Sequence, residues 1–271
     1  MLIPSFRTSG WRHVSLDVTL ATLADIGFGA VEFCLEHPDA APRCMTDDRC
    51  AELVADMARH GLSFASVSWH GKREHPSMKR DYTLRLIDIA ARLCHHGADT
   101  DVVVIGSSLP GATSEETEAR FRFLVDLYGE AARRAGDHGL RLAVEPEPDT
   151  VIEGTAEMDR LLDAVDHPAL TVNLDLGHAE VTEGDVPGSI RHFASVLAHV
   201  HIEGIANRVH DHLVPGDGDL DVPGALRVLD EVGYAGPATI DLFRIQGREA
   251  EWSRRAYEGL VACQRMAFGG R

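Results

Sequence analysis

The sequence predicts an α/β protein, a single (β/α)8 barrel of the TIM type that spans residues 1–271. Short apolar runs alternate eight times with amphipathic segments, and no long linker rich in Pro, Ser or Gly interrupts the alternation. The alternative is an open doubly wound sheet. No glycine fingerprint follows the first apolar run, so the barrel is favoured.

Eight apolar runs are expected to form the strands. They are residues 2–6, 30–34, 62–69, 101–105, 140–145, 170–175, 196–201 and 238–243. Helical spacing and end signals predict helices between these runs. The first begins at Ser15 and ends at Gly27, and another begins at the capping-box-like Thr-Ser-Glu-Glu at Thr113 and ends at Gly139. The remaining helices are expected over roughly 46–60, 79–96, 154–165, 186–195, 222–233 and 249–266.

The last predicted helix has an apolar stripe. This stripe suits packing on the chain's own barrel or on a second copy, so both a monomer and a homo-oligomer are compatible with the sequence.

Composition excludes several classes of protein. The net charge of −17 repels phosphate backbones and argues against nucleic-acid binding. The 5 cysteines are odd in number and form no C-x-x-C pair, which fits reduced thiols rather than a disulfide framework. No apolar run approaches a membrane span, and the first residues do not resemble a signal peptide. We therefore expect a soluble, cytoplasmic protein that acts on a small molecule.

Ionisable side chains recur at the ends of the predicted strands. They are His70, Glu145, Asp175, His201 and Asp241. Strand ends converge at one mouth of a barrel, where three carboxylates would repel one another without a cation. A divalent metal would turn the same residues into a mixed oxygen and nitrogen site.

Each of these residues also has a plainer interpretation. Glu145 is compatible with a salt bridge to Arg141 or Arg244. His201 taken alone fits a hydrogen-bonded core histidine, and Asp241 fits a cap of the following turn. Their joint occurrence at matching strand ends favours the metal site.

Several motifs resemble those of the xylose-isomerase-like barrel superfamily. They are LAVEPEP, VNLDLGH, HVHIEG, HLVPGDGDLD and GYAGPATIDLF, and the likeness is strongest between residues 140 and 243. This superfamily includes sugar phosphate isomerases and epimerases, inosose and dehydroshikimate dehydratases, and relatives of endonuclease IV. The resemblance implies one divalent metal, manganese before zinc, cobalt or magnesium, bound by Glu145, Asp175, His201 and Asp241. It also implies a substrate-binding role for Arg208.

The chain departs from the family at Asp241, where the family usually has Glu. The shorter side chain leaves its proton-transfer role in doubt, whereas Glu145 keeps the family's reach. In the endonuclease relatives an acidic residue and a histidine of the loop after strand seven share an additional zinc with the histidine of Asp-x-x-His. Here His178, His210 and His212 are the matching candidates for a second metal, with lid or substrate contacts as the alternative. His70 and Trp69 are expected to wall the mouth beside a sugar-like substrate.

Three functions follow in order of preference. The first is a metal-dependent isomerase or epimerase of a sugar, cyclitol or related polyol, which abstracts a proton next to a metal-polarised carbonyl; dehydration is its nearest variant. The second is a zinc phosphoesterase. The third is a binding barrel that has lost catalysis at Asp241.

Overall fold

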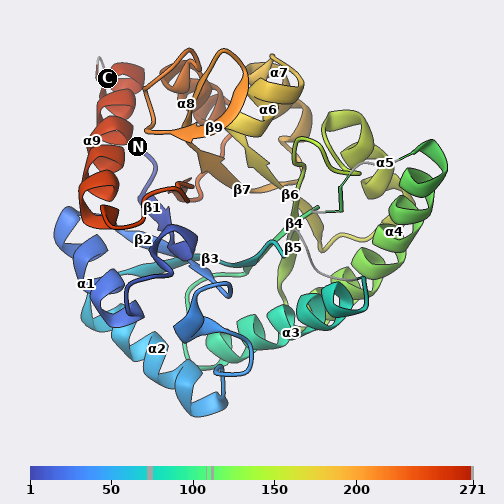
Figure 1. The fold of residues 1–271 in the computed structure, drawn as a ribbon, viewed down its shortest axis with the longest axis horizontal. Helices are drawn as coiled ribbons and strands as arrows, with labels where there is room; N and C mark the ends of the chain where they lie inside the picture. The colour runs from blue at the N-terminus through green and yellow to red at the C-terminus, as the bar shows by residue number, and fades with distance from the viewer. Residues whose placement is uncertain (72–75, 108, 111–112, 270–271) are drawn as a thin grey trace.

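A closed barrel of eight parallel strands forms the centre of the molecule, as predicted (Figure 1). The computed structural model describes residues 1–71, 76–107, 109–110 and 113–269. Strand order around the barrel follows the chain, and β1 pairs with β10 to close it. The barrel strands are β1 (Pro4–Arg7), β2 (Ala30–Cys34), β3 (Ser63–Trp69), β4 (Val102–Gly106), β5 (Arg141–Glu145), β6 (Leu170–Asp175), β7 (Leu197–Ile202) and β10 (Ala238–Ile240).

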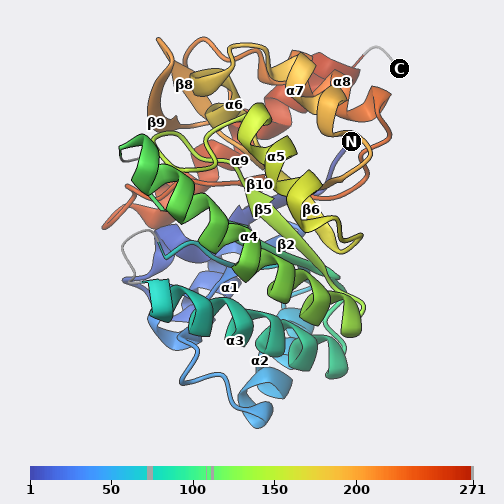
Figure 2. The ribbon, with the colours of Figure 1, turned by 90° about the vertical axis from the view of Figure 1, so that its right-hand side faces the viewer.

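Helices surround the barrel, and α3 and α4 lie side by side on its outside (Figures 1 and 2). The C-terminal helix α9 packs against α1, α8 and β1, so its apolar stripe docks on the chain's own barrel. The helices are α1 (Leu16–Ile26), α2 (Asp47–Arg59), α3 (Pro76–His95), α4 (Ser114–Asp137), α5 (Thr155–Val165), α6 (Leu176–Thr182), α7 (Val186–Phe193), α8 (Val222–Glu231) and α9 (Glu249–Phe268), with short 3-10 turns η1 (Thr8–Trp11) and η2 (Pro38–Ala40). Among the described residues, no helix combines the length and apolar character that crossing a membrane requires.

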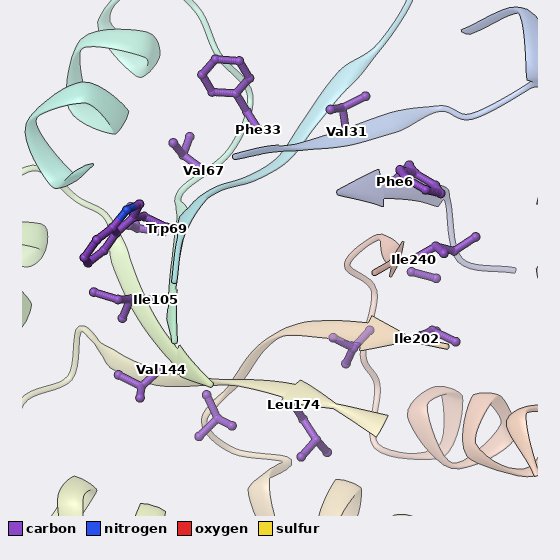
Figure 3. Packing of buried hydrophobic residues seen from close by; sticks show 14 of the residues in the cluster. Phe6, Val31, Phe33, Val67, Trp69, Ile105, Val144, Leu174, Ile202 and Ile240 are labelled. Carbon is purple, nitrogen blue, oxygen red and sulfur yellow. The ribbon is translucent and has the colours of Figure 1, made fainter. Parts of the chain in front are cut away.

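Successive side chains of the strands serve two different layers. In β3, Val67 and Trp69 belong to the main hydrophobic cluster, whereas Ser66 and Ser68, which alternate with them along the strand, are buried polar residues. This two-residue period is that of a strand whose neighbouring side chains point to opposite faces. Figure 3 shows apolar members of the main cluster on strands around the barrel.

The barrel interior is more polar than the branched aliphatic filling usual for this fold. A small apolar cluster, separate from the main one, consists of Val102, Val104, Ala143 and Ala198 from β4, β5 and β7, so it crosses the lumen past β6. Other contacts between non-adjacent strands are polar. They join β2 with β7 and β3 with β5, and they lead to the carboxyl ends of the strands.

The structure differs from the prediction in four respects. Helix α6 begins directly at the end of β6, and a hairpin of β8 (Gly204–Ala206) and β9 (Val209–Leu213) follows β7; neither element was predicted. Strand β10 is shorter than expected. Helix α1 begins after Ser15, but the Asp39 carboxylate from a neighbouring loop caps it by accepting from the Leu16 N–H at 3.0 Å.

The five cysteines are free thiols, in agreement with the sequence.

One of the chain's two lysines, Lys79 on α3, is fully buried. Its ammonium donates to the Gly106 carbonyl at 3.2 Å and lies 5.4 Å from the Trp69 ring centroid. Burial lowers the pKa of Lys79 to about 7, against an attraction to Glu36 that raises it. The unfolded chain therefore binds more protons than the folded chain between pH 7 and 10.5, and stability should rise with pH across this window.

We expect Lys79→Met to remove this pH dependence. The free energy of unfolding should lose a slope on the order of 1 kcal/mol per pH unit near the middle of the window. Urea unfolding of wild type and variant at pH 7 and pH 9.5 measures it. Arg85→Met, which removes an exposed cation of the same helix, is the control and should leave the slope unchanged. Equal slopes for Lys79→Met and wild type would contradict the expectation.

Candidate functional site

A cavity of about 530 Å³ opens at the carboxyl ends of the strands. This is the end at which barrel enzymes carry their active sites. Five of the residues singled out from the sequence line it: His70, Glu145, His178, His212 and Asp241. The other lining residues had not been selected; they are Arg7, Ser9, Arg12, Glu36, Gly71, Glu147 and Phe243.

Glu145, at the end of β5, is surrounded by imidazoles. Its Oε2 lies 2.9 Å from Nε2 of His70 and 3.1 Å from Nδ1 of His201, and it accepts from the Asn173 amide at 2.7 Å. Oε1 lies 3.4 Å from Nδ1 of His178. Burial opposes ionisation, but His70 and His201 outweigh it and hold the pKa of Glu145 well below its usual range. Glu145 is therefore a carboxylate at neutral pH.

The alternative arginine partners of Glu145 are engaged elsewhere. Arg141 binds Asp101 at 2.7 Å, and Arg244 binds Asp211 at 3.0 Å. Both pairs are exposed at the surface, so the salt bridge considered for Glu145 is wrong for either arginine.

Asp175 ends β6 and caps α6 through its Oδ1, which accepts from the His178 N–H at 2.8 Å. Its Oδ2 is buried and has no hydrogen bond of good geometry to the described residues, and it lies 3.8 Å from Nε2 of His178 and 3.8 Å from Nδ1 of His201. Burial opposes ionisation, yet His178 and the neighbouring Glu203 carboxyl hold the pKa of Asp175 below its usual range. A buried, ionised oxygen needs a donor or a cation, which protonated Glu203, a water or a metal ion would supply.

Arg7, at the end of β1, is the main site residue that the sequence analysis missed. Its guanidinium binds Asp241 at 2.9 Å and Glu32 at 3.0 Å, and it also contacts Nδ1 of His70. Burial and the Arg7 charge act in opposite directions on Asp241, and the pKa of Asp241 is lowered. The sequence analysis expected the carboxylates at the strand ends to repel one another unless a metal ion was bound. That expectation was incomplete, because Arg7 supplies a cation of the protein itself. Arg7 directly follows the first predicted run, the same signal that selected His70.

His201 bridges two carboxylates across the barrel. Its Nε2 lies 2.9 Å from Oε2 of Glu32, on the opposite side of the ring from Glu145. Burial disfavours the imidazolium, but Glu32 and Glu145 outweigh it and hold the pKa of His201 well above its usual range. His201 is thus a hydrogen-bonded core histidine and a member of the strand-end cluster at once. Glu32 could have been recognised in the sequence as the carboxylate in the middle of the apolar run 30–34.

Glu203 is a further buried carboxyl group that the sequence analysis did not select. Neither of its oxygens forms a hydrogen bond with the described atoms, and burial beside Asp175 holds its pKa well above the usual range. A Cβ atom on Gly177 would lie 1.8 Å from Oε1 of Glu203, so glycine is required where α6 passes this side chain. Glu203 is therefore a neutral acid beside an ionised Asp175.

Three histidines converge through their Nε2 atoms beside the cavity. His178 and His210 approach to 3.0 Å, and so do His210 and His212. Nδ1 of His178 lies 3.1 Å from the Pro146 carbonyl, and Nδ1 of His212 lies 2.8 Å from the Asp241 carbonyl. Because a carbonyl only accepts, both Nδ1 atoms must donate, and both Nε2 lone pairs point toward the cluster. Metal-binding histidines show this arrangement.

The hairpin explains why His210 and His212 share a face. Asn207 and Arg208 have φ angles of 54° and 56° and form the two-residue turn between β8 and β9. This is the turn geometry that matches the strand twist, and residues two apart on β9 then point the same way. The Arg208 guanidinium donates to the carbonyls of Val181 and Thr182 at 3.0 and 3.3 Å, away from the residues that line the cavity.

The tryptophans lie in packing positions. Trp69 stacks on Tyr82 with ring centroids 5.2 Å apart and is 4% exposed. Trp11 is buried and donates to Ser253 at 3.1 Å. Neither belongs to the residues that line the cavity, whereas His70 does.

Comparison with known proteins places the chain in a family. A family model described as "Xylose isomerase-like TIM barrel" matches residues 20–262. The chain belongs to this family. Two relatives with assigned names are similar to it at low identity, and many solved structures share its fold.

The 2-oxo-tetronate isomerase of Cupriavidus necator is 27% identical over 242 residues, which are 83% of this chain and 85% of that protein. The 3-dehydroshikimate dehydratase of Pseudomonas putida is 27% identical over 264 residues, 91% of this chain but 39% of the longer relative. A crystal structure of IOLI protein with a bound zinc atom superposes with a TM-score of 0.79 at 16% identity, covering 99% of both chains. Members of this xylose isomerase-like family thus include an isomerase and a dehydratase.

The donor atoms of the site fit a divalent cation. Ligand-type atoms of Glu145, Asp175 and His178 lie within 4.8 Å of one another, as do those of His178, His210 and His212. Carboxylate oxygens and imidazole nitrogens are ligands that manganese and zinc accept. The buried, ionised Oδ2 of Asp175, which needs a donor or a cation, also favours an ion.

Arg7→Met tests how far the site depends on one buried cation. The variant leaves Glu32 and Asp241 buried without that cation, so we expect a loss of about 3–5 kcal/mol in the free energy of unfolding. Arg141→Met breaks an exposed pair and should cost at most about 1 kcal/mol. Urea denaturation measures both variants, and equal losses would contradict the dependence described here.

Proposed function

We propose that the protein is a divalent-metal-dependent isomerase or epimerase of a small polyhydroxylated carbonyl compound. The observation that carries the proposal is the convergence of Glu145 and Asp175 with the imidazoles of His178 and His201 next to the cavity that Glu145 and His178 line. The cavity volume of about 530 Å³ suits a molecule of sugar or cyclitol size. The isomerase among the relatives supports the reaction class.

Glu145, Asp175 and His201 would hold the metal, with Asp241 at the edge of the set. A bound divalent metal polarises the substrate carbonyl and stabilises the enediolate. Asp241 differs from the other three because Arg7 already binds its Oδ2 at 2.9 Å. We therefore assign Asp241 to a supporting position, in which it orients a water or a substrate hydroxyl.

Glu145 is placed to move the proton. It lines the cavity and is ionised at neutral pH, so it can accept a proton from the carbon next to the carbonyl. His70 donates to the same carboxylate at 2.9 Å and keeps it oriented toward the cavity. Return of the proton to a neighbouring carbon completes isomerisation, and loss of a β-hydroxyl instead completes dehydration. The dehydratase among the relatives makes the second outcome the nearest alternative.

Glu145→Gln should lower the rate by roughly 10²–10⁴ because it keeps the side-chain shape and removes the base. The measurement is solvent deuterium entering the product when ketoses and keto-cyclitols are incubated with the manganese-loaded enzyme. Glu147→Gln is the matched control, since it removes one negative charge from the same cavity wall. If Glu145→Gln exchanges the substrate proton at the wild-type rate, Glu145 is not the base.

A zinc phosphoesterase is the second candidate, and the three converging histidines favour it. His178, His210 and His212 would hold an additional zinc, as in the endonuclease relatives. The net charge of −17 argues against a nucleic-acid substrate. The end of β4 also argues against it, because Gly106 and Ser107 stand where those relatives supply a further histidine.

Metal content of the double variant His210→Ala/His212→Ala separates the two roles of this cluster. If the histidines bind a second metal, mass spectrometry should find one equivalent fewer, with the Glu145 site still loaded. Constant metal content with a raised KM would assign them to substrate contacts instead. His95→Ala/His96→Ala removes another neighbouring pair, at the C-terminal end of α3, and should change neither quantity.

A further inference from the structure

We propose that Glu32 is a positioning residue that holds the Nε2–H of His201 and thereby leaves Nδ1 of that ring for the metal. Glu32 lies on β2 and belongs to neither the proposed ligand set nor the family motifs found in the sequence. The inference rests on the proposed metal site and adds to it the atom through which His201 binds.

The contacts of Glu32 fix its carboxylate from several directions. Its Oε1 lies 3.0 Å from Nε of Arg7, and its Oε2 accepts from the Ser66 hydroxyl at 2.7 Å. The same Oε2 lies 2.9 Å from Nε2 of His201 and 3.1 Å from Nε2 of His199. The side chain is 0% exposed, so bulk solvent does not reach the carboxylate.

The two nitrogens of His201 face different groups. Nε2 faces Glu32, deep in the barrel, whereas Nδ1 lies 3.1 Å from Oε2 of Glu145 and 3.8 Å from Oδ2 of Asp175. A nitrogen that binds a metal must offer its lone pair, and the other nitrogen then keeps the proton. A carboxylate on Nε2 retains that proton there, because a carboxylate can only accept. Oε2 of Glu145 holds a proton on Nδ1 in the same way while no metal is bound, but Glu145 and Asp175 are the proposed ligands of the metal. Nδ1 is therefore the nitrogen whose proton a metal bound by these two carboxylates would displace.

Glu32 also connects His201 with the opposite side of the mouth. Arg7 binds Glu32 through Nε and Asp241 through Nη1, so a single carboxylate orients both the imidazole and the guanidinium. The competing arrangement is a cation deeper in the barrel, bound by Glu32, His199 and His201, whose ligand atoms also lie within 4.8 Å of one another. In that arrangement Nε2 of His201 would be the ligand, which makes the two distinguishable.

Zinc and the ¹⁵N-labelled protein provide the test. Two-dimensional ¹⁵N–¹H spectra of the imidazoles identify which nitrogen of each histidine carries the proton, and a His201→Gln sample assigns the His201 signals. For zinc-loaded wild type we expect His201 with the proton on Nε2 and zinc on Nδ1. In Glu32→Gln the zinc affinity read from the His201 signals should fall about tenfold to a hundredfold.

Ser66→Ala is the matched control because it removes one hydrogen bond to Oε2 of Glu32 and keeps the carboxylate. It should leave the His201 tautomer unchanged and zinc affinity within about twofold of wild type. An equal loss in Ser66→Ala and Glu32→Gln would show a general packing effect and overturn the inference.

The remaining outcomes are also decisive. Zinc on Nε2 of His201, or a Glu32→Gln protein that binds zinc as wild type does, overturns the role of Glu32 and leaves the proposed function intact. Failure of wild type to bind zinc at His201 overturns the metal site and this inference with it. If Glu32→Gln does not fold, the wild-type spectrum decides alone.

Discussion

Two buried carboxylates, Glu32 and Glu145, organise the mouth of the barrel through hydrogen bonds and ion pairs with side chains from four other strands. His201 lies between them, within 2.9 Å of one and 3.1 Å of the other. His70 donates to Glu145 and accepts from the Arg7 guanidinium, and Arg7 in turn binds Glu32. Together with His201, these contacts close into a ring. A buried charge that loses its partner costs several kcal/mol. Each member of this ring consequently depends on the others for its position, and the cavity depends on all of them.

The sequence was sufficient for the parts of the structure that local patterns determine. The eight apolar runs predicted the barrel strands because a strand has a short, recognisable period, and Gly27, with φ 117°, ended α1 as expected. The proximity of Glu145, Asp175 and His201 followed from barrel topology, since β5, β6 and β7 are neighbours. The pair of Arg7 and Asp241 did not follow in the same way. It joins residues 234 positions apart through the closure of β1 on β10. The position of Arg7 directly after the first apolar run could have selected it, but no local pattern indicates Asp241 as its partner.

The elements that were missed also have physical reasons. Helix α6 has seven residues, too few for an amphipathic period to be visible, and it is stabilised by the Asp175 cap instead. The β8–β9 hairpin is short: β8 has three residues, and the centre of β9 is polar. Hydrophobic alternation therefore gives no signal there, and the Asn207-Arg208 turn was the local indication. Arg208 shows the limit of transferring a role by motif. Its backbone makes the turn, and its guanidinium binds the end of α6 rather than the cavity.

The charges of the buried site explain why a divalent cation suits it even though Arg7 is present. Four carboxylates, those of Glu32, Glu145, Asp175 and Asp241, have pKa values below their usual range and are ionised. Two cations oppose them, Arg7 and the His201 imidazolium, which leaves an excess of two negative charges. Glu203 does not add to this excess because burial beside Asp175 keeps it protonated. The excess lies toward Glu145 and Asp175, since Arg7 is held by Glu32 and Asp241. A divalent ion placed there would displace the Nδ1 proton of His201, because a nitrogen that binds metal must give up its proton. Two positive charges would replace one, so the excess would fall from two negative charges to one.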